Sequence, residues 1–239
     1  MINEFIKYLK EQVENRSIYV WGAQGQYEPT VCEKWICKRE KNTGGTTVNG
    51  KYMTYADIAV NMWKSRHDQY GSVLRAFDCS GLGVCFFLDH KLIKSDLSAN
   101  GLKRLCTEAK DRKAGYWAFR LNAKGKATHI GYFIDSDYII EAKGRAYGVV
   151  KTKYKASAWD FIGIPSIFDF SPDTDKKIKV KGSVNVREGN GTKYKKIGTA
   201  KNCLLPYFGQ AEDPPYWYKT QFKGVDGYIS SKERLTEIV

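Results

Sequence analysis

The stretch Phe77-Asp78-Cys79-Ser80-Gly81-Leu82, which leads into the apolar run 83–88, is the strongest indication of fold and function in this sequence. A polar turn followed by an apolar run predicts the start of a buried helix, with Cys79 in its first turn. Unpaired backbone N–H groups and the helix dipole favour negative charge there, so we expect Cys79 to have thiolate character. Thiolate attacks carbonyl carbon, and Cys79 is therefore the candidate nucleophile.

A predicted β-hairpin supplies the partners of this nucleophile. Alternating side chains predict a strand over 128–134, and residues 138–142 predict the returning strand after a three-residue turn. With that turn length, Glu141 lies opposite Gly131 and on the same face as His129; a turn one residue shorter would move Glu141 to the opposite face. A cysteine nucleophile, a His129 base and a Glu141 orienting group then form a generalised triad.

Four short motifs follow one another along the chain. They are Tyr19-Val20-Trp21-Gly22, Asp78-Cys79-Ser80-Gly81-Leu82, His129-Ile130-Gly131-Tyr132-Phe133 and Ile140-Glu141-Ala142-Lys143-Gly144. In this order they resemble the NlpC-type papain-like cysteine peptidases of bacterial cell walls. The resemblance implies an α+β fold in which the cysteine starts a helix packed on an antiparallel sheet that carries the histidine. It also implies a third polar residue twelve positions after the histidine, where Glu141 stands; many relatives have histidine, asparagine or glutamine there.

The resemblance further implies substrate-binding roles for Tyr19, Asp78 and Ser80. In the family, the tyrosine of the first motif lies beside the nucleophile, where its hydroxyl can hold substrate or the oxyanion. Relatives use the residues flanking the cysteine, together with that tyrosine, to hold the leading residues of the stem peptide. An ionised Asp78 would bind a free L-alanine amine through a charge-assisted hydrogen bond.

The domain organisation departs from that of the shortest relatives. Residues 28–76 insert about fifty residues between the first two motifs, and we expect this insertion to shape or cap the substrate groove. A helical pattern runs from Tyr55 to His67 within it. The papain-like domain is predicted to span 1–168, and the polar stretch 169–176 predicts a linker.

Residues 177–239 predict a small all-β barrel, because short apolar runs alternate with turn residues. The expected strands are 178–180, 184–187, 191–197, 216–219 and 227–230. The order Val184-Asn185-Val186-Arg187-Glu188-Gly189, Trp217-Tyr218-Lys219 and Gly227-Tyr228-Ile229-Ser230-Ser231 resembles bacterial Src-homology-3-type (SH3-like) domains, which hold enzymes on cell walls. This region has twelve Lys/Arg and six Asp/Glu, so +6 of the total net charge of +13 lies on about a quarter of the chain.

The net charge of +13 indicates a polyanionic partner. Dense basic runs and helix-turn-helix, zinc-finger or aromatic RNA-binding patterns are missing, which argues against nucleic acid. Peptidoglycan and the anionic teichoic acids of a Gram-positive wall match the charge and the resemblance. We expect no membrane span, because the sequence has no apolar stretch of 18 residues. No secretory signal is visible at the amphipathic N-terminus.

The six cysteines are spaced irregularly and predict no disulfide framework, which suits synthesis in a reducing cytoplasm. Cys32 and Cys37 are close enough in sequence to bridge or to bind metal. With three histidines in the chain and no second cysteine pair nearby, the sequence argues against a zinc site. We therefore expect no metal and no cofactor, and the sequence does not define an oligomeric state.

These features together predict a peptidoglycan hydrolase that cleaves stem peptides of Gram-positive walls by a Cys-His-Glu thiol mechanism. The favoured bond is the γ-D-glutamyl link to the diamino acid, and the alternative is the amide between muramic acid and L-alanine. A non-hydrolytic wall-binding protein and a cysteine acyltransferase are weaker alternatives, since Cys79 and His129 are intact and the barrel is of the wall type. Domain order and the lack of a signal favour a phage or prophage endolysin, made in the cytoplasm and acting on the wall after release.

Overall fold

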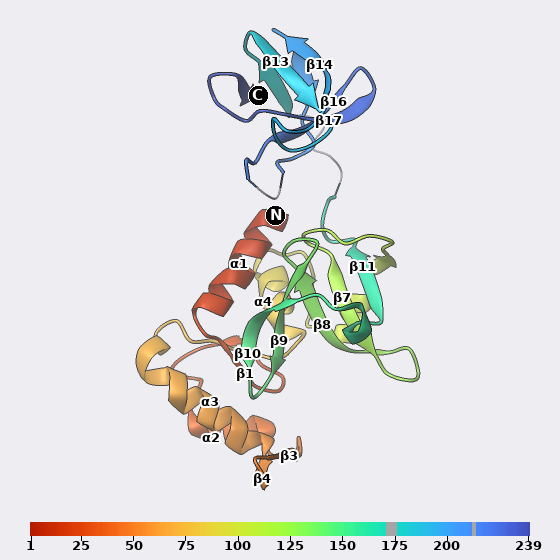
Figure 1. Ribbon diagram of the computed structural model, residues 1–239. Helices are drawn as coiled ribbons and strands as arrows, with labels where there is room; N and C mark the ends of the chain where they lie inside the picture. The colour runs from red at the N-terminus through yellow and green to blue at the C-terminus, as the bar shows by residue number, and fades with distance from the viewer. Residues whose placement is uncertain (171–175, 212–213) are drawn as a thin grey trace. The chain divides into compact units, whose positions relative to one another are not determined.

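The computed structural model describes residues 1–170, 176–211 and 214–239 (Figure 1). The chain divides into two compact units, Met1–Phe168 and Asp169–Val239. The first unit mixes helices and strands, and the described residues of the second contain strands but no helix. Most of the predicted linker, 171–175, lies outside the described residues.

The first unit has five α-helices, one short 3₁₀-helix and three groups of strands within its described residues. The helices are α1 (Ile2–Glu14), α2 (Glu33–Glu40), α3 (Tyr55–Tyr70), α4 (Gly81–Asp89), α5 (Ala99–Lys103) and η1 (Ala156–Ala158). A six-stranded antiparallel sheet has the order β10 (Gly148–Lys153), β9 (Tyr138–Gly144), β8 (Ala127–Phe133), β7 (Trp117–Leu121), β11 (Phe161–Pro165), β6 (Cys106–Glu108). The remaining strands are β1 (Ile18–Tyr19), β5 (Ala76–Phe77) and β2 (Gln24–Gln26) in a small sheet, and the hairpin β3 (Gly45–Val48), β4 (Lys51–Thr54).

Helix α4 lies against the six-stranded sheet (Figure 1), and aromatic side chains form the contact. The Phe87 ring stacks on Trp117 with 5.1 Å between centroids, and both side chains are fully buried. Gly83 has no room for a side chain, because a Cβ there would lie 2.4 Å from the Tyr132 hydroxyl. Glycine costs about 1 kcal/mol in a helix, but here it permits close approach of α4 to β8. The start of α4 is thereby fixed relative to the strand that carries His129.

The small sheet brings the first motif to the nucleophile. Strand β5 lies between β1 and β2, and its parallel pairing with β1 places Tyr19 opposite Phe77. The backbone N–H of Val20 donates to the carbonyl of Phe77 at 3.0 Å. Residues that are almost sixty positions apart in sequence therefore meet immediately before Cys79.

The insertion forms α2, the β3–β4 hairpin and α3. A capping box starts α3: the Thr54 hydroxyl accepts the Asp57 N–H at 3.0 Å, and the Asp57 carboxylate accepts the Thr54 N–H at 3.1 Å. The predicted helix from Tyr55 is confirmed and continues to Tyr70. The β3–β4 hairpin was not predicted, although its Asn49-Gly50 turn, with φ of 50° and 78°, is the sequence type that favours such hairpins.

The insertion shares one apolar core with the small sheet. Buried residues of β1 and β5, including Ile18 and Ala76, contact Ile36 of α2 and Ala59 of α3 in a single cluster. Trp63 of α3 is partly buried against that cluster. The insertion is therefore an integral part of the first unit rather than a loose loop.

The second unit has two antiparallel sheets around one apolar core. One sheet has the order β15 (Leu204–Pro206), β12 (Lys177–Val180), β18 (Thr236–Ile238), and the other has the order β14 (Lys196–Lys201), β13 (Ser183–Arg187), β17 (Val225–Ile229), β16 (Tyr218–Phe222). Buried side chains from both sheets, such as Ile178 and Val186, form the core. The predicted strand 191–197 is wrong over most of its length, because 191–195 form a turn with Gly191 at φ 139°. Strands β15 and β18 were not predicted.

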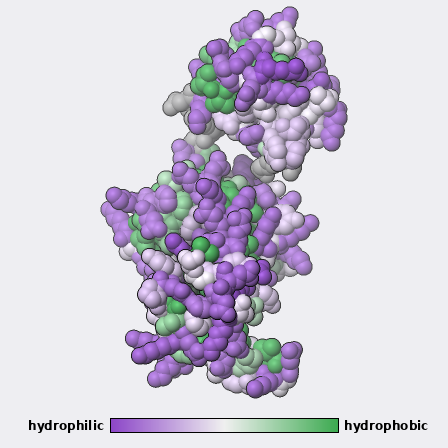
Figure 2. Space-filling view, turned by 90° about the vertical axis from the view of Figure 1, so that its left-hand side faces the viewer, coloured by the Kyte–Doolittle hydropathy of each residue, from purple (hydrophilic) through white to green (hydrophobic). Residues whose placement is uncertain are grey.

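Within the described residues, no helix has the length and apolar character needed to cross a membrane. Figure 2 shows hydrophilic residues over most of the visible face, with hydrophobic residues in scattered groups. Among the exposed large hydrophobic residues, Trp21 is 55% exposed although it belongs to the first motif. Its side chain is therefore not part of the core.

Candidate active site

Cys79 lies in a turn that Asp78 closes. The Asp78 carboxylate oxygen Oδ1 accepts hydrogen bonds from the Gly81 N–H at 2.6 Å and the Ser80 hydroxyl at 3.1 Å. The carbonyl of Asp78 accepts the Leu82 N–H at 3.2 Å. Regular helix is assigned from Gly81, but these bonds extend the first turn back to Asp78. Cys79 therefore lies in the turn immediately before the buried helix, two residues ahead of Gly81, rather than within the helix itself.

The predicted thiolate character of Cys79 is wrong for the free protein. The thiol is only 9% exposed, and burial, reinforced by the negative charge of Asp78, raises the pKa of Cys79 to about 12. Backbone N–H groups of Ser80, Ile130 and Cys79 lower this pKa, but they do not compensate for the loss of solvent. The carboxylate that closes the turn thus opposes the effect of the helix start, and the resting side chain is a neutral thiol.

His129 and Glu141 lie side by side on the β8–β9 hairpin. The strands pair Tyr132 with Ile140 and Phe133 with Ile139, which is the register predicted from a three-residue turn. His129 Nε2 and Glu141 Oε2 are 2.7 Å apart. The predicted hairpin and the shared face of these two residues are therefore confirmed.

Glu141 is a buried carboxylate with several donors. Its side chain is 2% exposed, and Oε1 accepts a hydrogen bond from the Thr152 hydroxyl of β10 at 2.9 Å. Arg120 Nη2 of β7 lies 3.8 Å from Oε2. Burial by itself would raise the pKa of Glu141, but the hydrogen bonds from His129 and Thr152 and the Arg120 charge hold it below its ordinary value. Glu141 is thus kept ionised beside the imidazole.

Trp159 holds the imidazole from one side. The two rings stack with 5.7 Å between centroids and 23° between planes. The indole also covers Gly131, where an added Cβ would lie 2.8 Å from the Trp159 ring and 2.5 Å from Ile139. Gly131 therefore leaves the space that the indole needs to lie on the sheet beside His129.

Cys79 contacts the strand on both sides of His129. Its Sγ atom lies 4.0 Å from the Thr128 carbonyl oxygen, and the Ile130 N–H is one of the groups that stabilise its charge. The nucleophile candidate is therefore placed against the backbone of His129. Glu141 occupies Nε2 of the imidazole. The structure thus places Cys79 against the strand that carries His129, and His129 against Glu141.

The three predicted substrate-binding residues surround the same place. Burial, and after it the proximity of Cys79, raise the pKa of Tyr19, so this hydroxyl stays protonated and can donate. The second carboxylate oxygen of Asp78 accepts the Gly22 N–H at 3.0 Å. Both Asp78 oxygens and the Ser80 hydroxyl are therefore engaged in holding the turn. The substrate roles of Tyr19, Asp78 and Ser80 stay predictions.

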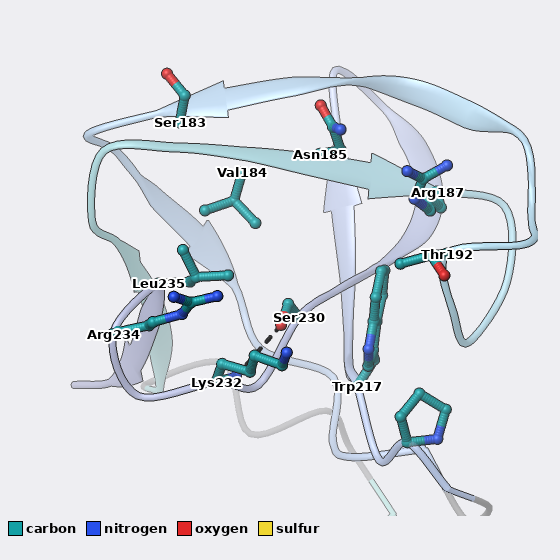
Figure 3. Close-up of a pocket in the computed structure, with 11 residues that line it drawn as sticks. Ser183, Val184, Asn185, Arg187, Thr192, Trp217, Ser230, Lys232, Arg234 and Leu235 are labelled. Carbon is teal, nitrogen blue, oxygen red and sulfur yellow. Dashed lines mark hydrogen bonds between the residues drawn. The ribbon is translucent and has the colours of Figure 1, made fainter.

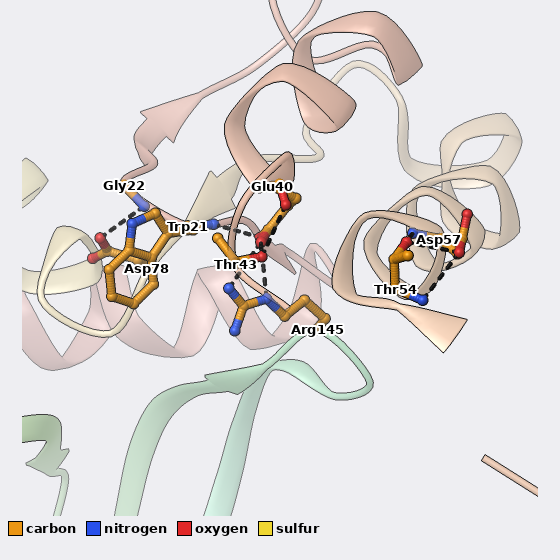
Figure 4. A network of polar contacts seen from close by, with 8 residues as sticks. All are labelled: Trp21, Gly22, Glu40, Thr43, Thr54, Asp57, Asp78 and Arg145. Atoms are coloured by element: carbon orange, nitrogen blue, oxygen red, sulfur yellow. Dashed lines mark hydrogen bonds and ion pairs between the residues drawn. The ribbon is translucent and has the colours of Figure 1, made fainter. Parts of the chain in front are cut away.

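A buried carboxylate in the insertion was missed by the sequence analysis (Figure 4). Glu40, at the end of α2, is 1% exposed and accepts the backbone N–H of Trp21 at 2.8 Å. It also accepts the Thr43 hydroxyl at 2.6 Å and two donors of Arg145, Nε at 3.1 Å and Nη2 at 2.8 Å. Glu40 therefore joins the insertion, the first motif and the β9–β10 connection.

A basic pocket of about 410 Å³ lies in the second unit (Figure 3). Trp217, Arg187, Lys232 and Arg234 line it, and none of its described lining residues is acidic. Arg187 donates from Nη1 to the Tyr194 carbonyl at 2.8 Å, while its buried Nε has no partner among the described residues. These three cations have no ion pair within the described part of the chain. The pocket thus concentrates part of the positive charge seen in the sequence.

All six cysteines are free thiols. No group of three or more histidine, cysteine or acidic side chains suited to a metal occurs in the described residues. Cys32 and Cys37 form neither a disulfide nor part of such a group.

No family model matches the sequence, and no curated protein matches it. Several solved structures are similar, and three of them are described here. The peptidoglycan hydrolase RipB from Mycobacterium tuberculosis is 14% identical, with a TM-score of 0.41, over 70% of this chain and 67% of that chain. The P60 domain of an antigen from M. avium subspecies paratuberculosis is 14% identical, with a TM-score of 0.40, over 70% of this chain and 98% of that chain. Ly7917, solved with the hydrolysis product of MDP, is 12% identical, with a TM-score of 0.26, over 67% and 88%.

Proposed function

We propose that this protein is a peptidoglycan hydrolase of the NlpC type, a cysteine peptidase that cleaves stem peptides with Cys79, His129 and Glu141. The observation that carries the proposal is the His129–Glu141 pair at 2.7 Å on one hairpin, with the Cys79 thiol against the backbone on both sides of His129. A nucleophile, a base and a group that orients the base are the parts that acyl transfer requires.

In the proposed mechanism, proton transfer accompanies attack. Because the pKa of Cys79 is raised to about 12, Nδ1 of His129 takes the thiol proton as Sγ bonds to the peptide carbonyl carbon. Ionised Glu141 fixes the imidazole through Nε2 and stabilises the imidazolium. The C–N bond then breaks as His129 returns the proton to the leaving amine. Water, deprotonated by His129, hydrolyses the thioester and restores the thiol.

The developing oxyanion needs donors beside Cys79. The backbone N–H of Cys79 lies in the turn just ahead of α4, beside the N-terminal end of the helix, where N–H groups lack partners within the helix. Tyr19 is a second donor, because burial and the proximity of Cys79 raise its pKa and keep its hydroxyl protonated. These two groups support a tetrahedral intermediate at the nucleophile.

For the bond, we favour the γ-D-glutamyl link to the diamino acid, with the muramoyl–L-alanine amide as the alternative. An endopeptidase that binds a free L-alanine amine needs an accepting carboxylate near Cys79. Asp78 is that carboxylate, but three donors of the chain already occupy its two oxygens. Because these hydrogen bonds already engage Asp78, it is poorly suited to bind a free amine strongly. We therefore favour stem peptides that are still attached to sugar as the substrate.

One experiment tests activity and bond together. Purified Gram-positive walls are digested with the wild type, Cys79→Ala and Cys106→Ala, while turbidity and newly exposed amines are measured. Cys106 is a matched control, since burial also raises its pKa to about 12, but it begins the edge strand β6, which β7 and β11 separate from β8 in the sheet. We expect Cys79→Ala to lose more than about a thousandfold in rate and Cys106→Ala to stay near wild type. Lysis by Cys79→Ala would contradict the mechanism.

The position of the newly exposed amines identifies the bond. New amines on the diamino acid support the endopeptidase, and new N-terminal L-alanine supports the amidase.

We further propose that the second unit is an SH3-like module that binds anionic wall polymers through the basic pocket. Removing the charges of Arg187, Lys232 and Arg234 by substitution with glutamine should weaken wall binding about tenfold, if each contributes about 0.5 kcal/mol. The control replaces three exposed lysines outside the pocket, Lys196, Lys201 and Lys223. If both triple variants lost wall binding equally, binding would depend on the overall positive charge of the unit and not on the pocket. We also propose that the protein is an endolysin, which is made in the cytoplasm and reaches the wall when it is released at lysis.

A further inference from the structure

A second pocket, of about 260 Å³, lies beside the candidate active site and has no part in the mechanism above. Trp21, Asn42, Thr43 and Arg145 line it. Asn42 and Thr43 belong to the insertion, Trp21 to the first motif, and Arg145 to the connection between β9 and β10. The pocket is therefore lined partly by the insertion and partly by the rest of the first unit.

The pocket is close to the nucleophile along two connections. Trp21 is followed by Gly22, whose N–H donates to Asp78 at 3.0 Å, and Asp78 precedes Cys79. The Arg145 guanidinium lies 4.8 Å from the centre of the Tyr19 ring and 5.8 Å from that of Trp21. A ligand in this pocket would therefore lie next to whatever is bound at Tyr19 and Cys79.

The walls of the pocket are held before any ligand binds (Figure 4). Glu40 fixes the backbone of Trp21, the hydroxyl of Thr43 and two nitrogens of Arg145 at once. Arg39 donates to the Gly22 carbonyl as well. A pocket whose walls are ordered by its own hydrogen bonds loses little conformational entropy when it takes a ligand.

The chemistry of the lining favours a neutral, polar ligand with one apolar face. The Arg145 charge is paired twice with Glu40, so the pocket does not present a free cation. The Trp21 indole is 55% exposed and offers a flat apolar surface. Exposed Asn42 forms no side-chain hydrogen bond within the described residues, so its amide is available as donor and acceptor.

We propose that this pocket is a saccharide subsite that binds an N-acetylhexosamine of the glycan to which the stem peptide is attached. The apolar face of the sugar ring stacks on Trp21, and its hydroxyl and acetamido groups bond to Asn42 and Thr43. This inference rests on the proposed function. It specifies the substrate as stem peptides that are still linked to sugar. It agrees with the engagement of Asp78, which leaves that carboxylate poorly suited to a free amine.

Hydrolysis of two soluble substrates tests the subsite. They are N-acetylmuramyl-L-alanyl-γ-D-glutamyl-diamino acid and the same tripeptide without sugar. We expect the wild type to have a kcat/KM at least about tenfold higher for the sugar-linked peptide, equivalent to about 1.4 kcal/mol. Trp21→Ala should reduce that ratio to near one, mainly through KM, because the backbone N–H that Glu40 holds is retained. Tyr52→Ala, which removes a 64% exposed aromatic of the same insertion, should preserve the ratio. An unchanged ratio in Trp21→Ala overturns the subsite.

Direct binding separates this inference from the proposed function. Calorimetry is carried out with the full-length Cys79→Ala protein and the free disaccharide of N-acetylglucosamine and N-acetylmuramic acid. We expect binding that Trp21→Ala abolishes and Tyr52→Ala retains. Absence of disaccharide binding overturns the subsite even if the wild type hydrolyses stems. Binding by a protein that hydrolyses neither peptide would support the subsite and overturn the hydrolase.

Discussion

Two buried glutamates, Glu40 in the insertion and Glu141 on the β9 strand, have similar surroundings and different partners. Their exposed fractions are 1% and 2%, and each accepts a hydrogen bond from a threonine hydroxyl. Glu40 forms two hydrogen bonds with Arg145. Glu141 forms one with His129, and its nearest arginine nitrogen is 3.8 Å away.

The difference between the partners separates a structural carboxylate from a candidate catalytic one. Arginine stays charged at every relevant pH, so the Glu40–Arg145 pair can only hold its neighbours in place. Histidine gains and loses a proton near neutrality, so a carboxylate beside it can stabilise a charge that appears during a reaction. Burial and charge alone do not distinguish the two sites, and the partner does.

The largest effect should come from removing Glu40. Glu40→Ala leaves the mostly buried Arg145 without its counter-charge, and we expect a loss of about 3–5 kcal/mol in the free energy of unfolding. The control is Glu33→Ala in the same helix, whose half-exposed pair with Lys64 at 2.7 Å should contribute less than about 1 kcal/mol. Urea unfolding followed by circular dichroism measures both. Equal stability of the two variants would mean that Glu40 does not organise the insertion.

Glu141 should affect catalysis more than stability. We expect Glu141→Ala to lower kcat/KM by about 10–100-fold and Glu141→Gln to lower it less, since the amide can still bond to His129. His129→Ala should be the most impaired of the three. Rates on soluble muropeptides and their pH profiles distinguish an orienting role from a general loss of structure. Undiminished rates in both Glu141 variants would assign the third position to another residue.

The smallest effect concerns pH. Interactions in the folded protein hold the pKa of Glu141 below its ordinary value, so its ionised form stabilises the fold above the unfolded pKa of about 4.3. That contribution disappears as pH falls through the folded pKa. We expect the stability difference between wild type and Glu141→Gln, on the order of 1 kcal/mol near pH 7, to vanish in acid. If the stability difference between the two proteins grew as the pH fell, the folded protein would raise the pKa of Glu141 instead of lowering it.

The sequence predicted the His129–Glu141 hairpin because the information is local. Twelve residues separate the two side chains, and the two-residue period of a strand determines their common face once the turn length is known. The placement of Cys79 at a helix start was predictable for the same reason. Its protonation was not, because burial by distant segments and the charge of Asp78 together outweigh the local N–H groups.

Glu40 shows what local patterns cannot reveal. It ends a short helix with charged residues on most positions, which is typical of a solvated surface. Its partner Arg145 lies 105 positions away, and no spacing rule joins them. The β3–β4 hairpin is a different case, since its Asn49-Gly50 turn is a local signal that the sequence itself contains.

The parallel pairing of β1 with β5 also has a consequence for the order of folding. Ile18 meets Ala76, 58 positions later, and each doubling of a closing loop costs about 0.6 kcal/mol in chain entropy. The α3 cap and the β3–β4 hairpin use only contacts between near neighbours, so they can form before that loop closes and shorten its effective length. We therefore expect the insertion to fold early and the strand before the nucleophile to dock late, so that the thiol is buried in one of the last steps of folding.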